Sequence, residues 1–416
     1  ANNMTAVSWT PTAAGTYYWG ASYAGDGNNN SVSSCGGTNE TIVVSKTTPS
    51  ITTTLKNAAG DTTIGEGSSI GLGSSVYDTS TLGNLNGVAA TGTITYQYFT
   101  NGTCSNTPSH EDAGVAVGGS SKTQGPLGAG SYSFRAKYVA GSDAAHTDSD
   151  WSSCEPFTVA KATPTAATTL KNAADDSTVT NGSSLALNSS LYDTAQITGV
   201  SGVTLSGTVT FQFFTNSTCT GSPLSTESGV APGTNSATKG PLGAGDYGFR
   251  AKYVAGSDPN YDDSSFSSCE PFSIGKGTPS SATTLKNAAG DATVADGTTL
   301  AINSSVYDTA QITAGDGLAL TGTVTFDFFT NGTCSGTPEN TQTGVAVGAQ
   351  SDATGALGAG DYGFRAMYVA GNDSNHNDSA WSACEPFSIA KASPTISTTL
   401  SGTEVLVGSS VHDSAT

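Results

Sequence analysis

The residues with the clearest chemistry are six cysteines that form three pairs with one constant spacing. The pairs are Cys104 with Cys154, Cys219 with Cys269, and Cys334 with Cys384. An even number of cysteines in each repeat predicts one disulfide per repeat, formed in an oxidising compartment. Zinc is a poor alternative, because the sequence has no Cys-x-x-Cys pair and its four histidines do not recur with the cysteines. The seventh cysteine, Cys35, belongs to a partial repeat whose partner cysteine would lie upstream.

Asparagines that begin an Asn-x-Ser/Thr sequon recur just before the first cysteine of each pair, at Asn101, Asn216 and Asn331. Such sequons accept N-linked glycans on exposed loops of secreted proteins. Further candidate acceptors lie elsewhere in the repeats, at Asn188, Asn303, Asn372 and Asn377. The alternative for the position before the cysteine is that Asn-Gly-Thr simply forms a turn. We expect covalent glycans, either N-linked at these sites or O-linked on the Ser/Thr-rich strands.

Aspartates are concentrated before the second cysteine of each pair. They are Asp143, Asp148 and Asp150, then Asp258, Asp262 and Asp263, then Asp373 and Asp378. Calcium takes six to eight oxygen ligands, which clustered carboxylates and asparagines can supply. Because no EF-hand or nonapeptide calcium pattern is present, we expect solvated turns, no metal site and no bound cofactor, with calcium as the alternative.

Three further positions recur once per repeat. Asp78, Asp193 and Asp308 each follow a tyrosine at the end of a predicted strand. A general acid would need a second carboxylate facing it across a cleft, so we predict that these aspartates accept hydrogen bonds in turns. One arginine and one glutamate per repeat, Arg135 and Glu155 in the first, are predicted to pair and clamp two strands.

Trp151 and Trp381 precede the second cysteine of their pairs, and Phe266 replaces them in the middle repeat. Exposed aromatic rings can stack on sugars, but packing within the core or at its rim is the commoner role. The chain has no Ser-His-Asp order, no P-loop and no dinucleotide fingerprint. We therefore predict no catalytic residue and no enzyme.

These positions recur because the chain repeats itself every 115 residues, as the prolines Pro49, Pro164, Pro279 and Pro394 mark. Complete units are predicted at 49–163, 164–278 and 279–393. Residues 1–48 match the last third of a unit and residues 394–416 match its first part. We interpret the sequence as a window on a longer array. A period of this length is too long for a solenoid coil and suits a sandwich of about 100 residues.

Alternating polar and apolar residues predict the strands of each unit. In 208–214 the side chains of Val209, Phe211 and Phe213 share one face, and 93–99 and 323–329 repeat the pattern. We expect six to eight strands per unit. The linkers are short and contain proline, as in 160–164, which favours a stiff rod over a flexible string.

The strand TVTFQFFTNSTC, the segment GAGDYGFRAKYVAGSD and the closing SSCEPFSI resemble the immunoglobulin-like repeats of large bacterial and archaeal surface proteins. The resemblance covers the whole chain. It implies an all-β fold, namely a tandem array of immunoglobulin-like β-sandwich domains joined by short linkers, as in giant adhesins, stalks and extracellular filaments. It says little about biochemical activity, because this fold hosts many roles.

Charge and hydropathy limit which classes of binding partner we expect. The net charge is −19 and the pI about 4.2, so nucleic acid is a poor partner. No apolar run is long enough to span a membrane. The first hypothesis is a structural one: a glycosylated extracellular filament or cell-surface stalk whose units bind their own neighbours head to tail. The alternatives are the stem of an adhesin that binds glycans or cells, and the accessory stalk of an enzyme.

Overall fold

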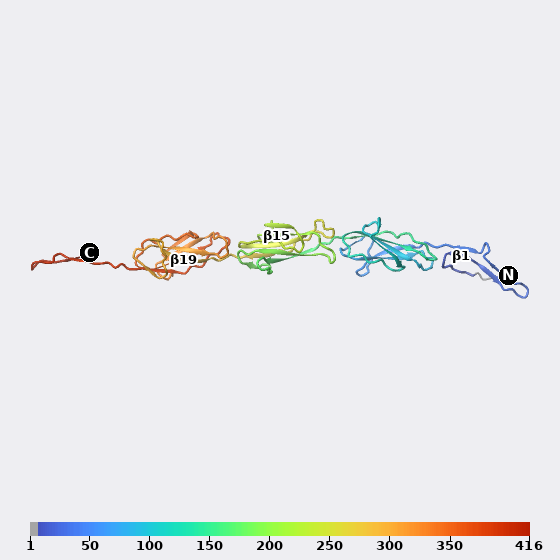
Figure 1. Cartoon of the computed structure of the whole chain (residues 1–416), viewed down its shortest axis with the longest axis horizontal. Helices are drawn as coiled ribbons and strands as arrows, with labels where there is room; N and C mark the ends of the chain where they lie inside the picture. The colour runs from blue at the N-terminus through green and yellow to red at the C-terminus, as the bar shows by residue number, and fades with distance from the viewer. Residues whose placement is uncertain (1–6) are drawn as a thin grey trace.

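A computed structural model describes residues 7–416, which form an extended row of β-sandwich units (Figure 1). Every regular element among these residues is a β-strand. Within the same range no helix is long and apolar enough to cross a membrane. The expected all-β fold class is confirmed.

The first complete unit has seven strands, within the expected six to eight. They are β5 (Ser50–Asn57), β6 (Ser69–Ile70), β7 (Val76–Gly83), β8 (Thr93–Phe99), β9 (His110–Ala116), β10 (Gly130–Val139) and β11 (Glu155–Val159). One sheet has the order β6-β11-β10-β8-β9, in which only β6 and β11 are parallel. The other sheet pairs β5 with β7, and two bridges extend it, Val76 with Gln124 and Thr79 with Ser120.

The next two units repeat this topology strand for strand. The second unit contains β12 (Thr165–Asn172), β13 (Ser184–Leu185), β14 (Leu191–Thr198), β15 (Thr208–Phe214), β16 (Ser225–Val230), β17 (Gly245–Val254) and β18 (Glu270–Ile274). The third contains β19 (Ser280–Asn287), β20 (Thr298–Leu300), β21 (Val306–Thr313), β22 (Thr323–Phe329), β23 (Asn340–Ala346), β24 (Gly360–Val369) and β25 (Glu385–Ile389). Two facing sheets with this strand order make each unit an immunoglobulin-like sandwich.

Within residues 7–48 and 394–416 the chain forms only short paired strands. They are β1 (Gly15–Tyr18), β2 (Gly20–Tyr23), β3 (Val32–Cys35) and β4 (Thr41–Val44) at one end, and β26 (Thr398–Leu400) and β27 (Asp413–Ala415) at the other. Pairing joins β1 to β4, β2 to β3, and β26 to β27. Large apolar side chains in these segments, such as Trp9 and Val407, remain exposed because no second sheet covers them.

The core of each unit lies between its two sheets. On β15 the alternating residues Val209, Phe211 and Phe213 are at most 2% exposed, as the sequence pattern predicts. Phe213 packs against Phe249 of β17 with ring centroids 4.7 Å apart. Burying one such side chain contributes roughly 1.5–3 kcal/mol. Strands predicted at 93–99, 208–214 and 323–329 are confirmed as β8, β15 and β22.

Candidate functional site: the joints between units

Each linker pairs with one loop of the unit that follows it. At the joint between the units 49–163 and 164–278, the Lys161 Nζ donates to the Asp258 carbonyl at 2.9 Å. The Ala162 N–H donates to the Asn260 carbonyl at 3.0 Å, and the Asp262 N–H donates to the Ala162 carbonyl at 3.0 Å. These two bonds form a parallel bridge between Ala162 and Tyr261. The same bridge recurs at the other two joints, between Thr47 and His146 and between Gly277 and His376. Lys46 and Lys276 also repeat the lysine bond.

The loop that receives the linker is held by its own aspartate. The Asp258 carboxylate is buried and accepts hydrogen bonds from the Tyr253 hydroxyl at 2.6 Å, the Ser206 N–H at 2.7 Å and the Asn260 N–H at 2.8 Å. Burial alone would raise its pKa, but these donors outweigh burial and hold the pKa of Asp258 well below its usual range. The loop that receives the linker is therefore held in shape by hydrogen bonds within its own unit.

These bonds bear on the predicted role of the aspartate-rich loops. Asp143 and Asp373 make the same kind of contact as Asp258, with the tyrosine hydroxyls of Tyr138 and Tyr368. Their carboxylates are occupied by donors from the protein itself, which makes them structural acceptors in buried turns rather than solvated ones. Among residues 7–416 no group of three or more His, Cys, Asp or Glu side chains is arranged to hold a metal ion.

A second contact crosses the joint from the body of the preceding unit. The Asn260 Oδ1 accepts a hydrogen bond from the Ala129 N–H at 2.9 Å, and Asn375 accepts one from the Ala244 N–H at 3.0 Å at the following joint. Alanine occupies the corresponding position, 145, at the first joint. There the Ala14 N–H donates instead to the Ala144 carbonyl at 2.9 Å. At every joint, therefore, the equivalent alanine N–H of the preceding segment has a hydrogen-bond acceptor in the following unit.

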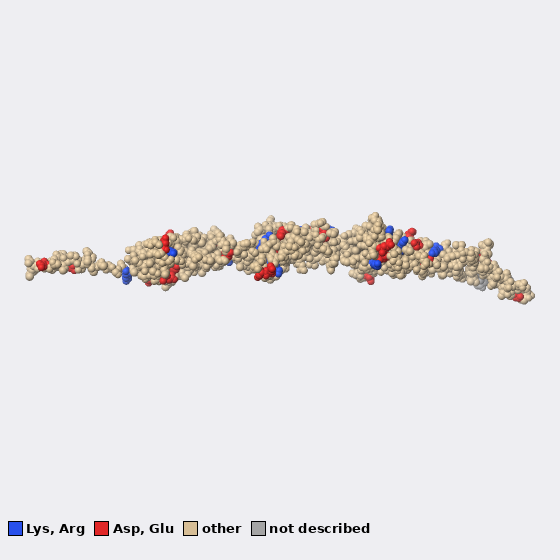
Figure 2. All heavy atoms as spheres, in the orientation of Figure 1, with Lys and Arg blue, Asp and Glu red and all other residues tan. Residues whose placement is uncertain are grey.

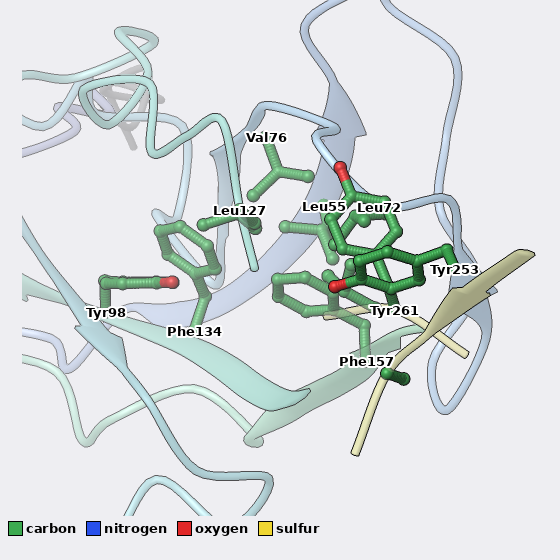
Figure 3. Packing of buried hydrophobic residues seen from close by; sticks show 11 residues of the cluster. Leu55, Leu72, Val76, Tyr98, Leu127, Phe134, Phe157, Tyr253 and Tyr261 are labelled. Carbon is green, nitrogen blue, oxygen red and sulfur yellow. The ribbon is translucent and has the colours of Figure 1, made fainter. Parts of the chain in front are cut away.

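The third contact is apolar. Tyr253 and Tyr261 belong to the same buried cluster as Leu72, Leu127 and Phe157 of the preceding unit (Figure 3). Val200 and Val203, in the loop after β14, pack against that cluster. The Tyr261 hydroxyl accepts a hydrogen bond from the Val200 N–H at 2.8 Å, which fixes the loop in place. The core of one unit therefore continues into the next.

The joints share a plan but differ in chemistry. Gly73 has a φ of +78°, and a Cβ there would lie 2.7 Å from Val200 Cγ1. The equivalent residue at the next joint is Asn188, with a φ of 72°, whose Nδ2 donates to the Asp316 carbonyl at 2.9 Å. His376 replaces Tyr261 there and lies between Asp373 at 2.9 Å and Asp316 at 3.1 Å. One joint is apolar and the next is polar.

The cysteine pairs form disulfides within each complete unit. Cys104 is bonded to Cys154, Cys219 to Cys269, and Cys334 to Cys384. Each bond ties the loop after the third long strand to the segment just before the last strand. Cys35 is free and exposed.

The sequon before each first cysteine is built into a tight turn. The Asn101 Nδ2 donates to the Ser105 carbonyl at 3.0 Å, and its Oδ1 accepts the Thr103 N–H at 3.0 Å. This turn holds Cys104 at a φ of 50°. Asn216 and Asn331 make the equivalent bonds to Thr220 and Ser335, which shows the turn that was the alternative role for this position.

The remaining sequons differ in how their amides are used. Asn188 contacts the next unit, and the Asn377 Nδ2 lies 3.4 Å from the Thr278 hydroxyl in the linker. Asn303 and Asn372 are exposed, and no residue of the described chain forms a hydrogen bond with their side-chain amide groups. These two positions leave the acceptor nitrogen open.

Two predictions about recurring charged residues are wrong. Asp78 is not a turn acceptor, because it points from β7 into the core and is fully buried. Arg135 does not pair with Glu155, because the two side chains lie on opposite faces of their sheet. The guanidinium stacks between Phe99 and Trp151, at 5.1 and 4.5 Å, and its Nε donates to Gln97 at 2.9 Å. Trp151 therefore packs against a neighbour, as expected.

The sequence contained signals that Asp78 and Glu155 point into the core. Asp78 alternates with Val76 along a strand and therefore shares its inward face, while Glu155 alternates with Phe157 and Val159. Both carboxyl groups must then enter the space between the sheets. The joints carried no comparable signal, because their contacts come from short loops whose conformation is not periodic.

Comparison with known proteins adds little to these observations. No protein-family model matches the sequence, and no curated protein matches it. Solved structures that resemble it include the FN1–FN3 domains of chicken CNTN1, at 11% identity over 79% of this chain and 100% of that chain, with a TM-score of 0.20. Another is FdeC, an Escherichia coli adhesin, at 14% identity over 81% and 96%, with a TM-score of 0.25. Similarity this low carries no argument, so the fold assignment depends on strand order and core packing.

Proposed function

We propose that this chain is part of an extracellular filament or cell-surface stalk whose function is to span distance. The observation that supports this proposal most strongly is that one kind of joint recurs at all three junctions. Each joint has a lysine that donates to a loop carbonyl, a parallel bridge, and a backbone N–H of the preceding segment that donates to the same loop. A flexible string would need none of these contacts. Their repetition favours a fixed orientation of each unit relative to the next.

The linkers support the same conclusion. Pro49, Pro164 and Pro279 are buried at the start of their units, and proline restricts both its own φ and the residue before it. Because the lysine, the bridge and the proline fall within four residues of each other, little chain is left to act as a hinge. Figure 1 shows the three complete units in one line.

The covalent chemistry supports an extracellular location. Disulfides persist in oxidising compartments and are rare in the cytosol, and every complete unit has one. The view in Figure 2 shows few charged side chains spread over a largely neutral surface. Glycans on Asn303 and Asn372 would keep such a surface hydrated, and glycopeptide mapping of native material tests their presence.

Small-angle scattering of the whole chain tests the rod. We expect a pair-distance distribution with evenly spaced features, one for each unit. The control variant replaces 160–163 with a Gly-Ser sequence of equal length, which removes the lysine and the bridge but keeps the contour length. A wild-type curve that matches this control would overturn the proposal.

One observation favours the alternative of a glycan-binding adhesin stem. Trp381 is 36% exposed and stacks on Arg365 at 4.2 Å on the outer face of the five-stranded sheet. Aromatic rings presented in this way can stack on sugars. Binding to a glycan array that is lost in Trp381→Ala would support this second function.

A further inference from the structure

A pair of carboxyl groups is buried in each complete unit. The pairs are Asp78 with Glu155, Asp193 with Glu270, and Asp308 with Glu385. All three aspartates are fully buried. Apart from one oxygen of Glu40, every buried side-chain oxygen without a hydrogen-bond donor in residues 7–416 belongs to these pairs. Unsatisfied buried polar atoms are rare in folded proteins and call for an explanation.

The pair connects the two sheets of the sandwich. Asp78 lies on β7 of the two-stranded sheet, and Glu155 is the first residue of β11 in the five-stranded sheet. Their side chains enter the same core, because Asp78 alternates with Val76 and Glu155 with Phe157, and these two apolar residues belong to one buried cluster. A hydrogen bond between two carboxyl groups requires a proton on one of them, because an ionised carboxylate can only accept.

No positive charge compensates the pair. The Thr53 side chain and the Thr54 backbone face it from β5, the Tyr96 hydroxyl from β8, and Glu66 from the loop before β6. The Ser121 hydroxyl is committed to the Asp78 N–H at 2.8 Å. None of these groups is a cation, and the only charged one, Glu66, is negative. Two carboxylates cannot both be ionised in such a place without a large free-energy cost.

We infer that each complete unit closes around one proton shared by its two buried carboxyl groups, and that losing this proton in alkali weakens the contact between the sheets. The unsatisfied oxygens then have their explanation, because the shared proton supplies the donor that the surrounding side chains lack. The pair recurs in all three complete units with the same partners on the same strands, so it is not peculiar to the packing of one unit.

The direction of the pKa shifts agrees with this geometry. Burial, and then the charge and hydrogen bond of Glu155, raise the pKa of Asp78 to about 9. Burial likewise raises the pKa of Glu155. Asp193 and Asp308 are raised to about 9 by the same causes. In the unfolded chain an aspartate releases its proton near pH 4.

The sign of the pH dependence follows from proton uptake. Between about pH 4 and pH 9 the folded unit holds a proton that the unfolded chain has released, so raising the pH favours unfolding. Stability from the pair is complete below about pH 4 and is lost as the pH rises toward 9. The unfolding equilibrium constant of a unit should rise up to tenfold for each pH unit in this window.

Urea unfolding of the whole chain between pH 5 and 8.5, followed by far-ultraviolet circular dichroism, tests the inference. Replacing all three aspartates, in Asp78→Asn/Asp193→Asn/Asp308→Asn, supplies a neutral amide donor to each glutamate and should flatten the pH dependence. Asp193→Asn alone should remove about a third of it. Asp246→Asn is the matched control, because Asp246 is exposed in the same unit and its loss should leave the wild-type slope.

Two results would overturn the inference: a wild-type midpoint that does not fall with pH, or a triple variant that keeps the wild-type slope. Infrared spectroscopy decides the case even if the variants do not fold. Folded wild-type protein at pH 7 should show the carbonyl band of a protonated carboxylic acid, and unfolding should abolish it. Absence of that band in the folded protein would contradict a shared proton.

Discussion

Replacing Gly73 with asparagine should open one joint without unfolding either unit. Gly73 has a φ of +78°, a region that asparagine tolerates better than most residues. Asn188 and Asn303 occupy the same place in the next two units, with φ of 72° and 66°. The backbone therefore accepts the change. The neighbouring unit does not, since a Cβ would lie 2.7 Å from Val200 Cγ1.

The expected cost comes from the valine that must move. Burying a valine side chain fully contributes about 1.5–3 kcal/mol, and Val200 is only partly buried. Losing this contact should weaken the joint by about 1–2 kcal/mol, which increases the population of the open joint roughly 5- to 30-fold. Val200 packs only at the edge of the buried cluster of the unit 49–163, so the stability of that unit should change by less.

Distance measurements between spin labels on the two units provide the assay. Gly73→Asn should broaden the distance distribution across the joint at 160–164. The double variant Gly73→Asn/Val200→Gly should narrow it again, because it places at this joint the residues that occupy the equivalent positions at the following joint, Asn188 and Gly315. An unchanged distribution in Gly73→Asn would refute the claim that Val200 packing orients the units. Unfolding of the unit 49–163 would refute the claim that asparagine fits the turn.

Three further changes test other parts of the structure. Removing one disulfide, in Cys219→Ser/Cys269→Ser, opens a loop of 50 residues and should lower the stability of that unit by about 4 kcal/mol in the chain-entropy model, measured by urea unfolding with reductant as a cross-check. Asn260→Ala removes the acceptor of the Ala129 N–H and should weaken the joint by about 1 kcal/mol, with Ala145, its natural counterpart, as the reference; a change in the core stability of either unit would contradict a role limited to the joint. The depressed pKa of Asp258 stabilises the fold above about pH 4, and this stability is lost as the pH falls below that value. Asp258→Asn should therefore reduce acid sensitivity in thermal unfolding at pH 2–5, and an unchanged acid profile would exclude this linkage.

Local patterns in the sequence predicted the fold well. Val209, Phe211 and Phe213 alternate with polar residues, which predicts a strand with these three side chains in the core, and β15 begins and ends where that pattern does. The other face of the strand is more buried than the alternation predicts, because Thr210 and Phe214 are buried as well. The cysteine spacing likewise identified partners, because each repeat contains only two cysteines. Both predictions depend on information that lies within one strand or one unit.

The joints and the acid pairs were not predicted because they depend on residues far apart in the chain. Asn260 contacts Ala129 across 131 positions, through a loop whose shape is set by Asp258. Asp78 was assigned to a turn because it was expected to lie at the end of a strand, yet the strand continues to Gly83. A lone charge on an inward-facing position indicates a buried partner only when the opposite sheet is known.

Variation between the joints shows which of their contacts are general. The lysine bond and the parallel bridge use mainly backbone acceptors, so they survive when the residues around them change, as they do at Thr47, Ala162 and Gly277. Side chains that complete each joint are free to alternate between apolar and polar sets. An array built in this way can keep one orientation between units while the strength of each joint is adjusted separately.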